Sequence, residues 1–212
     1  TTSRSVDWSA PFAQNLTHLE WCSRDDPPIV SLPRSLLTLR IPFYRVSLGE
    51  EDDFSRALPP KLTSLVLAWA PHRLDQMPST LTFMDPLRIN VLELHQVPQA
   101  TTSLTFSTAA SSLPAELALR TSLTELYVNS RYLISDTQHL PPCLTSLAIR
   151  TTLNRDAILA LPATLLSLSL ALTPDGPFLS SLDFEHLPRG LTSLKCHGSS
   201  KNTRLRLLPG TS

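Results

Sequence analysis

Apolar residues recur along this 212-residue chain in blocks whose central leucines lie 19 to 26 residues apart. A full block reads leucine, proline, two variable residues, Leu-Thr-Ser-Leu, one variable residue and an apolar residue. Full copies occupy residues 58–67, 140–149 and 187–196. Weaker copies bring the total to nine, so the chain is an array of internal repeats. They occupy residues 12–21, 32–41, 77–86, 97–106, 119–128 and 161–170.

Aligning the copies on the central leucine gives three apolar columns. Of their 27 positions, 25 are apolar and not proline, and the exceptions are Thr101 and Pro86. The last two apolar positions of each copy lie two residues apart, which is the period of a β-strand. The central column contains Leu19, Leu39, Leu65, Met84, Leu104, Leu126, Leu147, Leu168 and Leu194.

A strand of four or five residues cannot bury its apolar face alone. We therefore expect one strand per copy, stacked into a parallel sheet whose inner face is a column of leucines. The segments that return to the next strand are too short for normal helices, so we expect extended, turn and 3₁₀ pieces. One helical turn is expected over residues 156–160. Residues 89–94 also have a strand pattern, which leaves the register over 77–94 open.

Proline and threonine occupy fixed positions in the copies. Proline fixes φ and lacks an N–H, which suits an extended approach to the strand. Threonine stands two residues before the central apolar residue in seven of nine copies. We expect a ladder in which these hydroxyls bond to backbone of their own or the next copy, so that Thr145→Val costs about 1–3 kcal/mol. The alternative is that the hydroxyls contact only water.

The Leu-Pro-x-x-Leu-Thr-x-Leu pattern resembles the leucine-rich repeat superfamily. It is similar to FNIP-type repeats, through residues 15–19, and to the Leu-Pro-rich repeats of secreted bacterial effectors. The resemblance implies a leucine-rich-repeat solenoid with one parallel sheet on the concave face and irregular or extended convex arms with little helix. Residues 1–212 then form a single domain of about nine repeats, which we expect to be part of a longer array. The family's asparagine after the strand is absent, so another group must satisfy the backbone there.

Composition argues against several classes of function. The formal net charge is zero, which does not favour nucleic-acid binding. The chain has no apolar run long enough for a membrane span. Three cysteines without a disulfide pattern, Cys22, Cys143 and Cys196, favour a reducing, intracellular compartment. No phosphate loop, nucleophile elbow or zinc motif is present, so we expect neither an enzyme nor a cofactor.

Metal binding is not expected either. His18, Glu20 and Cys22 share one face of a strand, but His18 and Cys22 lie about 13 Å apart at strand rise, too far for one ion. Cys196 falls in an inward column and is expected to be a small core residue. The acidic runs at residues 25–26 and 50–53 are expected to be solvated loop charge, since they lack the spacing of a calcium loop.

The concave face carries the outward residues of the strands, and we expect it to bind a partner. Aromatic and arginine side chains are the anchors that protein interfaces use. The alternative is that these are ordinary, isolated exposed residues. The small-residue half of the face, residues 146–171, either contacts another surface or is simply solvated. The predicted binding residues are Arg40, Trp69, Phe83, Asp85, Leu87, Glu125, Tyr127 and Arg150.

These features favour a non-enzymatic module that binds a protein partner of unknown identity through its concave face. One alternative is a structural solenoid that self-associates into a larger assembly or filament. The resemblance to effector repeats implies another, the substrate-recognition part of a larger protein whose ubiquitin-ligase domain lies outside this chain.

Overall fold

The structure is a computed structural model that describes residues 13–22, 32–42, 57–67, 74–86, 91–130, 132–151, 153–172 and 186–198. The chain forms two compact units, Thr1–Phe106 and Ser107–Ser212, so the boundary lies within a strand, Ser103–Thr108. The described residues contain nine strands and little helix.

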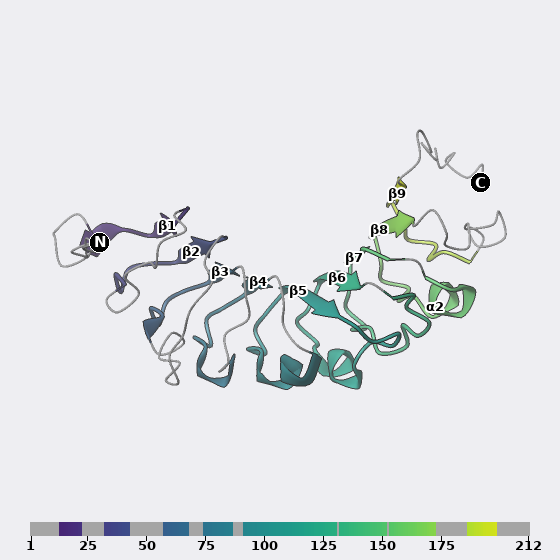
Figure 1. Cartoon of the computed structure of the whole chain (residues 1–212), viewed down its shortest axis with the longest axis horizontal. Coiled ribbons are helices and arrows are strands. Elements are labelled where there is room, and N and C mark those ends of the chain that lie inside the picture. Colours follow the sequence, from purple (N-terminus) through teal and green to yellow (C-terminus); the bar gives the residue numbers. More distant parts are fainter. Residues whose placement is uncertain are drawn as a thin grey trace. The chain divides into compact units, whose positions relative to one another are not determined.

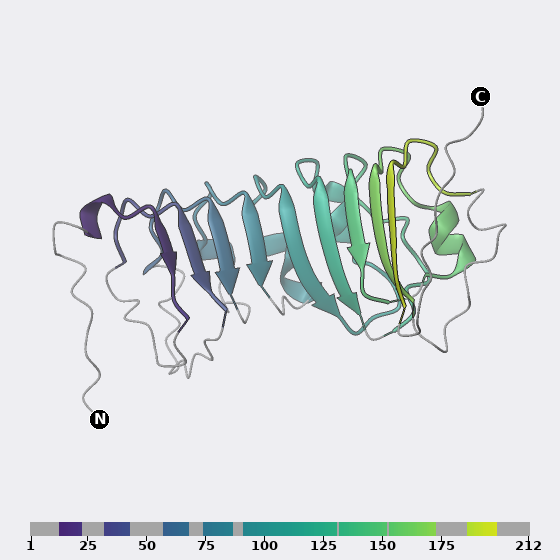
Figure 2. The ribbon, with the colours of Figure 1, turned by 90° about the horizontal axis from the view of Figure 1, so that it is seen from above.

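The first unit contains five parallel strands, β1 to β5, which pair in chain order (Figures 1 and 2). In the described segments, one short 3₁₀ helix precedes β1 and two lie between later strands. The strands are β1 (His18–Glu20), β2 (Thr38–Ile41), β3 (Ser64–Leu67), β4 (Phe83–Pro86) and β5 (Ser103–Thr108). The 3₁₀ helices are η1 (Ala13–Asn15), η3 (Leu74–Gln76) and η4 (Val91–Gln96).

The second unit contains four parallel strands, β6 to β9, again paired in chain order. In this unit the returning segments lie on one side of the sheet (Figure 1). The strands are β6 (Glu125–Ser130), β7 (Ser146–Ile149), β8 (Ser167–Leu172) and β9 (Ser193–Gly198). The helices are η5 (Ala115–Leu119) and α2 (Arg155–Leu159), and α2 is the helical turn expected at residues 156–160.

The register of the strands follows the central leucine column. In the first unit Leu39 is opposite both Leu19 and Leu65, and Met84 is opposite both Leu65 and Leu104. In the second unit the column continues from Leu126 through Leu147 and Leu168 to Leu194. The predicted strands and their alignment are therefore confirmed within each unit.

The register over residues 77–94 is also settled. Met84 stands in the central column, and the alternative strand is wrong over its described residues, 91–94. Residues Val91–Gln96 form the 3₁₀ helix η4 instead. This winding buries Leu94, whose carbonyl accepts a bond from the Val97 N–H at 3.2 Å.

The core of each unit lies against one face of its sheet, and the same face of every interior strand is buried. Leu39, Leu65, Leu147 and Leu168 are no more than 1% exposed. Thr101, which replaces a leucine in these columns, is buried as well. Its hydroxyl donates to the Leu81 carbonyl at 3.3 Å, which satisfies the polar atom inside the core.

The Leu-Pro pair begins a tight turn rather than a long extended approach. In seven copies the proline carbonyl accepts a bond from the N–H three residues later, at 3.0–3.2 Å. The turn places the next apolar residue at the start of the core. These prolines are Pro33, Pro59, Pro78, Pro98, Pro141, Pro162 and Pro188.

The alignment of the sixth copy is wrong at its first position. Leu119, assigned to the leading leucine, is 73% exposed, whereas Leu117 is fully buried. Pro114 makes the usual turn to the Leu117 N–H at 3.1 Å, and η5 then continues for two residues. Arg120 occupies the proline position and is buried, and that burial lowers the pKa of its guanidinium.

The threonine ladder is present, and its acceptor is a backbone carbonyl of the preceding copy. Thr63 donates to the Leu37 carbonyl at 3.1 Å, and Thr145 donates to the Thr124 carbonyl at 3.1 Å. The interpretation that these hydroxyls contact only water is wrong. Each acceptor also receives two N–H bonds, so the hydroxyl is its third donor. The same bond is made by Thr82, Thr102 and Thr192.

The structure also contains a second set of side-chain donors, which the sequence analysis does not predict. Each donor lies one residue before the apolar residue that follows the proline turn. Thr164 donates to the Leu144 carbonyl at 2.8 Å, and the Cys143 thiol donates to the Leu123 carbonyl at 3.2 Å. Ser35 and Thr80 make the equivalent bonds. Every donor bonds to the same position of the preceding copy. This set therefore links each of these copies to its predecessor.

Hydroxyl groups also replace the missing asparagine at the end of the strands in the second unit. They lie one residue before the position where asparagine is expected. Ser130 and Thr151 are buried, and both donate to the Tyr132 carbonyl, at 3.0 and 2.8 Å. Thr108 accepts a bond from the Ala110 N–H at 3.0 Å. Hydroxyls thus satisfy the backbone at the strand exit, as required of any substitute for asparagine.

Truncating a core leucine should destabilise the chain strongly. Leu147 is 1% exposed, so Leu147→Ala should lower the free energy of unfolding by about 2–5 kcal/mol in chemical denaturation. The matched control is Leu166→Ala, because Leu166 is 47% exposed and should change stability by less than about 1 kcal/mol. A loss below 1 kcal/mol at Leu147 would contradict the buried register.

The threonine ladder and the second set of donors should contribute different amounts to the free energy of unfolding. Thr145→Val leaves the Thr124 carbonyl with two N–H donors, so we expect a loss below about 1 kcal/mol, less than the sequence alone suggested. Thr164→Val removes a donor from the Leu144 carbonyl, to which no N–H of the described residues donates, and should cost about 1–2 kcal/mol. Urea denaturation of both variants compares them. Equal losses would contradict this redundancy.

Candidate functional site

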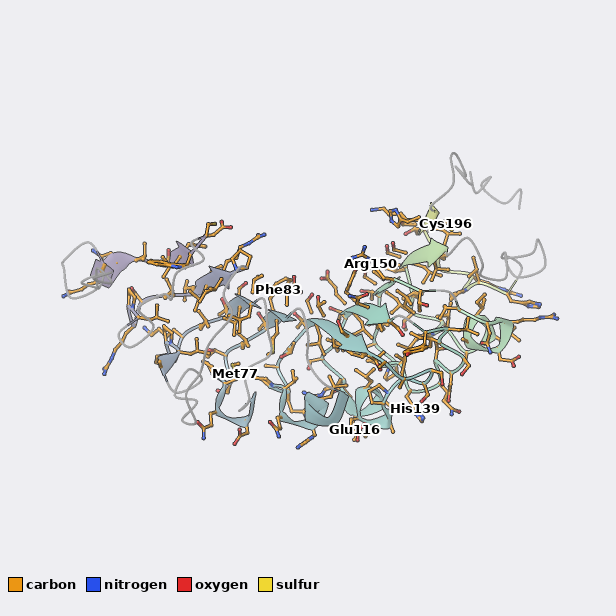
Figure 3. All side chains as sticks on the ribbon, in the orientation of Figure 1. Met77, Phe83, Glu116, His139, Arg150 and Cys196 are labelled. Atoms are coloured by element: carbon orange, nitrogen blue, oxygen red, sulfur yellow. The ribbon has the colours of Figure 1, made fainter. Side chains whose placement is uncertain are left out.

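The side of each sheet that faces away from the core carries the outward side chains, and we call it the open face of that unit. Its residues alternate with the buried ones along every strand, as in β5 and β6. In the first unit Phe83 lies on this face (Figure 3). In the second unit Arg150 lies there, whereas Glu116 and His139 lie on the side of the returning segments.

The open face of the first unit contains an alternating row of charges. The register places Glu20, Arg40, Val66 and Asp85 side by side on β1 to β4. The Arg40 guanidinium and the Glu20 carboxylate lie 3.2 Å apart, with side chains 55% and 54% exposed. Since water screens a pair this exposed, it contributes little to stability and leaves both groups accessible to a partner.

Phe83 is the large apolar side chain of this face. It is 37% exposed and stands between Ser64 and Ser103 in the register. An aromatic ring flanked by small polar side chains presents its surface to an approaching partner. Asp85 lies two residues further along the same strand and is partly exposed.

The open face of the second unit begins with Glu125 and Tyr127 on β6. Tyr127 is half-buried and lies opposite Ala148 of β7. Arg150 is exposed just beyond β7. Its N–H donates to the Val128 carbonyl at 2.8 Å, which continues the backbone hydrogen bonding between the two strands. Strands β7 and β8 contribute small side chains between these larger groups. They are Ser146, Ala148, Ser167 and Ser169.

The last strand adds two basic residues that are not among the predicted binding residues. Lys195 lies opposite Ser169, and His197 lies opposite Ala171. Both side chains are exposed. The register places His197 in the row of Arg150 and Lys195 two residues before it.

Two predicted binding residues, Trp69 and Leu87, lie outside the described residues, as do the acidic runs at 25–26 and 50–53. The remaining six are all at least partly exposed, and they divide between the units. Arg40, Phe83 and Asp85 belong to the first unit, and Glu125, Tyr127 and Arg150 belong to the second.

The three cysteines are free thiols. Cys196 is partly exposed and faces inwards opposite Leu170, and burial raises the pKa of its thiol. The raised pKa keeps the sulfur protonated, as suits a packing residue rather than a nucleophile.

Within the described segments, no three His, Cys, Asp or Glu side chains are placed to hold a metal ion. No helix in that part of the chain is long and apolar enough to cross a membrane. Comparison with protein-family models and with curated proteins gives no match.

The surface ion pair should contribute little to folding. Arg40→Gln should change the free energy of unfolding by less than about 0.5 kcal/mol, because both partners are exposed. Thermal or urea unfolding with and without added salt measures this change. A larger loss would mean that Arg40 stabilises the sheet and is unsuited to a binding role.

Proposed function

We propose that this chain is a leucine-rich-repeat solenoid that binds a protein partner through the open face of its sheet and carries no catalytic activity. The fold supports this proposal because each copy supplies one strand, paired in parallel with its neighbours in chain order within each unit. Stacked repeats of this kind present extended surfaces that are used for binding.

The observation that carries the proposal is the accessibility of the outward side chains. The aromatic ring of Phe83 and the guanidinium groups of Arg40 and Arg150 are exposed on the open faces. Tyr127 adds a half-buried aromatic ring. Aromatic and arginine residues dominate the energetics of protein interfaces.

Binding suits these faces better than catalysis. Catalytic groups need a site that excludes water and positions several of them around one reacting atom. Glu20, Arg40, Glu125 and Arg150 are instead exposed. Many hydroxyl groups that could act as nucleophiles, including those of Thr63, Thr145 and Thr192, already donate to backbone carbonyls.

A photo-cross-linking residue at position 83 or 127 tests which side of the sheet meets the partner. The control carries the same group at Glu116, which is exposed on the side of the returning segments. A protein cross-linked from positions 83 or 127 but not from 116 supports the proposal. Cross-linking from 116 alone would move the binding site to the returning segments.

Once that partner is purified, the double variant Phe83→Ala and Tyr127→Ala should weaken binding by at least about 1–2 kcal/mol. Isothermal titration calorimetry measures the affinity, and thermal unfolding should show nearly unchanged stability, since neither ring is fully buried. An unchanged affinity would exclude the open face as the main contact.

Size-exclusion chromatography with light scattering separates this function from self-association. A mass corresponding to one chain, independent of concentration, fits a binding module. A mass that grows with concentration favours the structural solenoid. The role as the recognition part of a larger effector predicts instead that the cross-linked partner is modified by a separate catalytic domain.

A further inference from the structure

We infer that the open face of the second unit recognises an extended, acidic segment of the partner protein. This inference rests on the proposed function and specifies the chemistry of its ligand. Three basic side chains carry it, namely Arg150, Lys195 and His197.

The register brings these three groups around one small-residue patch. Lys195 lies opposite Ser169 and His197 opposite Ala171, while Arg150 lies one residue beyond the β7 segment that pairs with β8. Strands are about 4.8 Å apart and residues two apart in a strand are separated by about 6.6 Å. Arg150 and His197 therefore start roughly 10 Å apart at one end of the sheet, and Lys195 starts about 6.6 Å from His197 and roughly 12 Å from Arg150.

Their charges are not neutralised within the sheet. Among the described residues, neither Arg150 nor Lys195 takes part in an ion pair. Glu125 is the only carboxylate among the described outward residues of β6 to β9, and it lies at the opposite end of the face. Four strand residues separate it from the Asn129–Arg150 end, about 13 Å at strand rise.

Small side chains at the centre of this face allow the backbone of a bound peptide to approach the sheet closely. Ser146, Ala148, Ser167 and Ser169 occupy the centre of the face, with Tyr127 on one side and Lys195 on the other. The serines provide neutral hydroxyl groups that can donate to peptide carbonyls. Carboxylates spaced two or three residues apart on an extended segment match the spacing of the basic groups.

A peptide fits this pattern better than a nucleic acid. A nucleic-acid strand carries a phosphate at every nucleotide and is bound through a continuous basic groove with stacking aromatic rings. On this face Arg150 and His197 lie at one end, Lys195 lies two residues before His197, and a carboxylate lies at the other end, with one aromatic ring. An acidic segment can place its carboxylates at the basic end alone.

The test uses a fluorescein-labelled glutamate-rich peptide and its glutamine counterpart, with the full chain, in fluorescence anisotropy. We expect the glutamate peptide to bind about tenfold more tightly than the glutamine peptide. The variant with Arg150→Gln and Lys195→Gln should lose that preference. The matched control, Arg155→Gln with Arg189→Gln, removes the same charge from exposed positions off the open face and should keep it.

Several results would overturn the inference. They are a missing preference for the glutamate peptide, a preference that survives in the Arg150/Lys195 variant, and an equal loss in the control variant. Equally tight binding of an oligothymidylate of the same charge, with the same sensitivity to Arg150→Gln and Lys195→Gln, would indicate a nucleic-acid site instead. Thermal unfolding confirms that the variants are folded.

The inference and the proposed function can fail separately. A partner cross-linked from position 127, without any preference for the glutamate peptide, would retain the binding function and reject only its acidic ligand. Loss of both the cross-link and the preference would reject both. Reversing the charges, with Arg150→Glu and Lys195→Glu, should transfer the preference to a lysine-rich peptide.

Discussion

No copy in this chain can bury its own leucines, because its strand has only three to six residues, so each copy depends on its neighbours. That dependence creates a second requirement, since the carbonyls at the ends of each strand must also find donors in the next copy. Threonine, serine and cysteine side chains supply some of these donors, as Thr164 and Cys143 do. Hydrophobic stacking therefore brings the copies together, and these side-chain bonds add a link between neighbouring copies.

The apolar columns could be predicted because they are tied to one residue type and one period. Leu39, Leu65 and Leu147 are recognisable from single copies, and aligning the copies predicts the neighbours of each in its column. The second set of donors was harder to see, because Ser35, Thr80, Cys143 and Thr164 share a role without sharing an identity. Leu119 was misplaced for a related reason: without a proline at position 120, the 3₁₀ winding of η5 decides which leucine is buried.

The residues of the candidate site could also be predicted in part, from the alternation of side chains along each strand. Alternation along each strand was enough to place Arg40, Phe83, Tyr127 and Arg150 on the outward side. Alternation alone does not show which of them are neighbours, but the alignment of the copies does, and that alignment holds within each unit. It puts Glu20 beside Arg40, and Lys195 in the row next to that of Arg150. What it does not show is which neighbouring side chains bond to each other, as those of Glu20 and Arg40 do.

The exchange at residues 100 and 101 illustrates how such a chain can change during evolution. Ala100 stands where other copies have a hydroxyl donor, and Thr101, one residue later, donates to the Leu81 carbonyl in its place. A donor can therefore move by one residue while its acceptor stays fixed. Since each copy offers the same acceptors to the next, in-frame duplication or deletion of a whole copy recreates the same bonds at the new junction. The length of the array, and with it the area of the open face, can thus change in whole-copy steps, whereas inserting one residue inside a strand would reverse which side chains are buried.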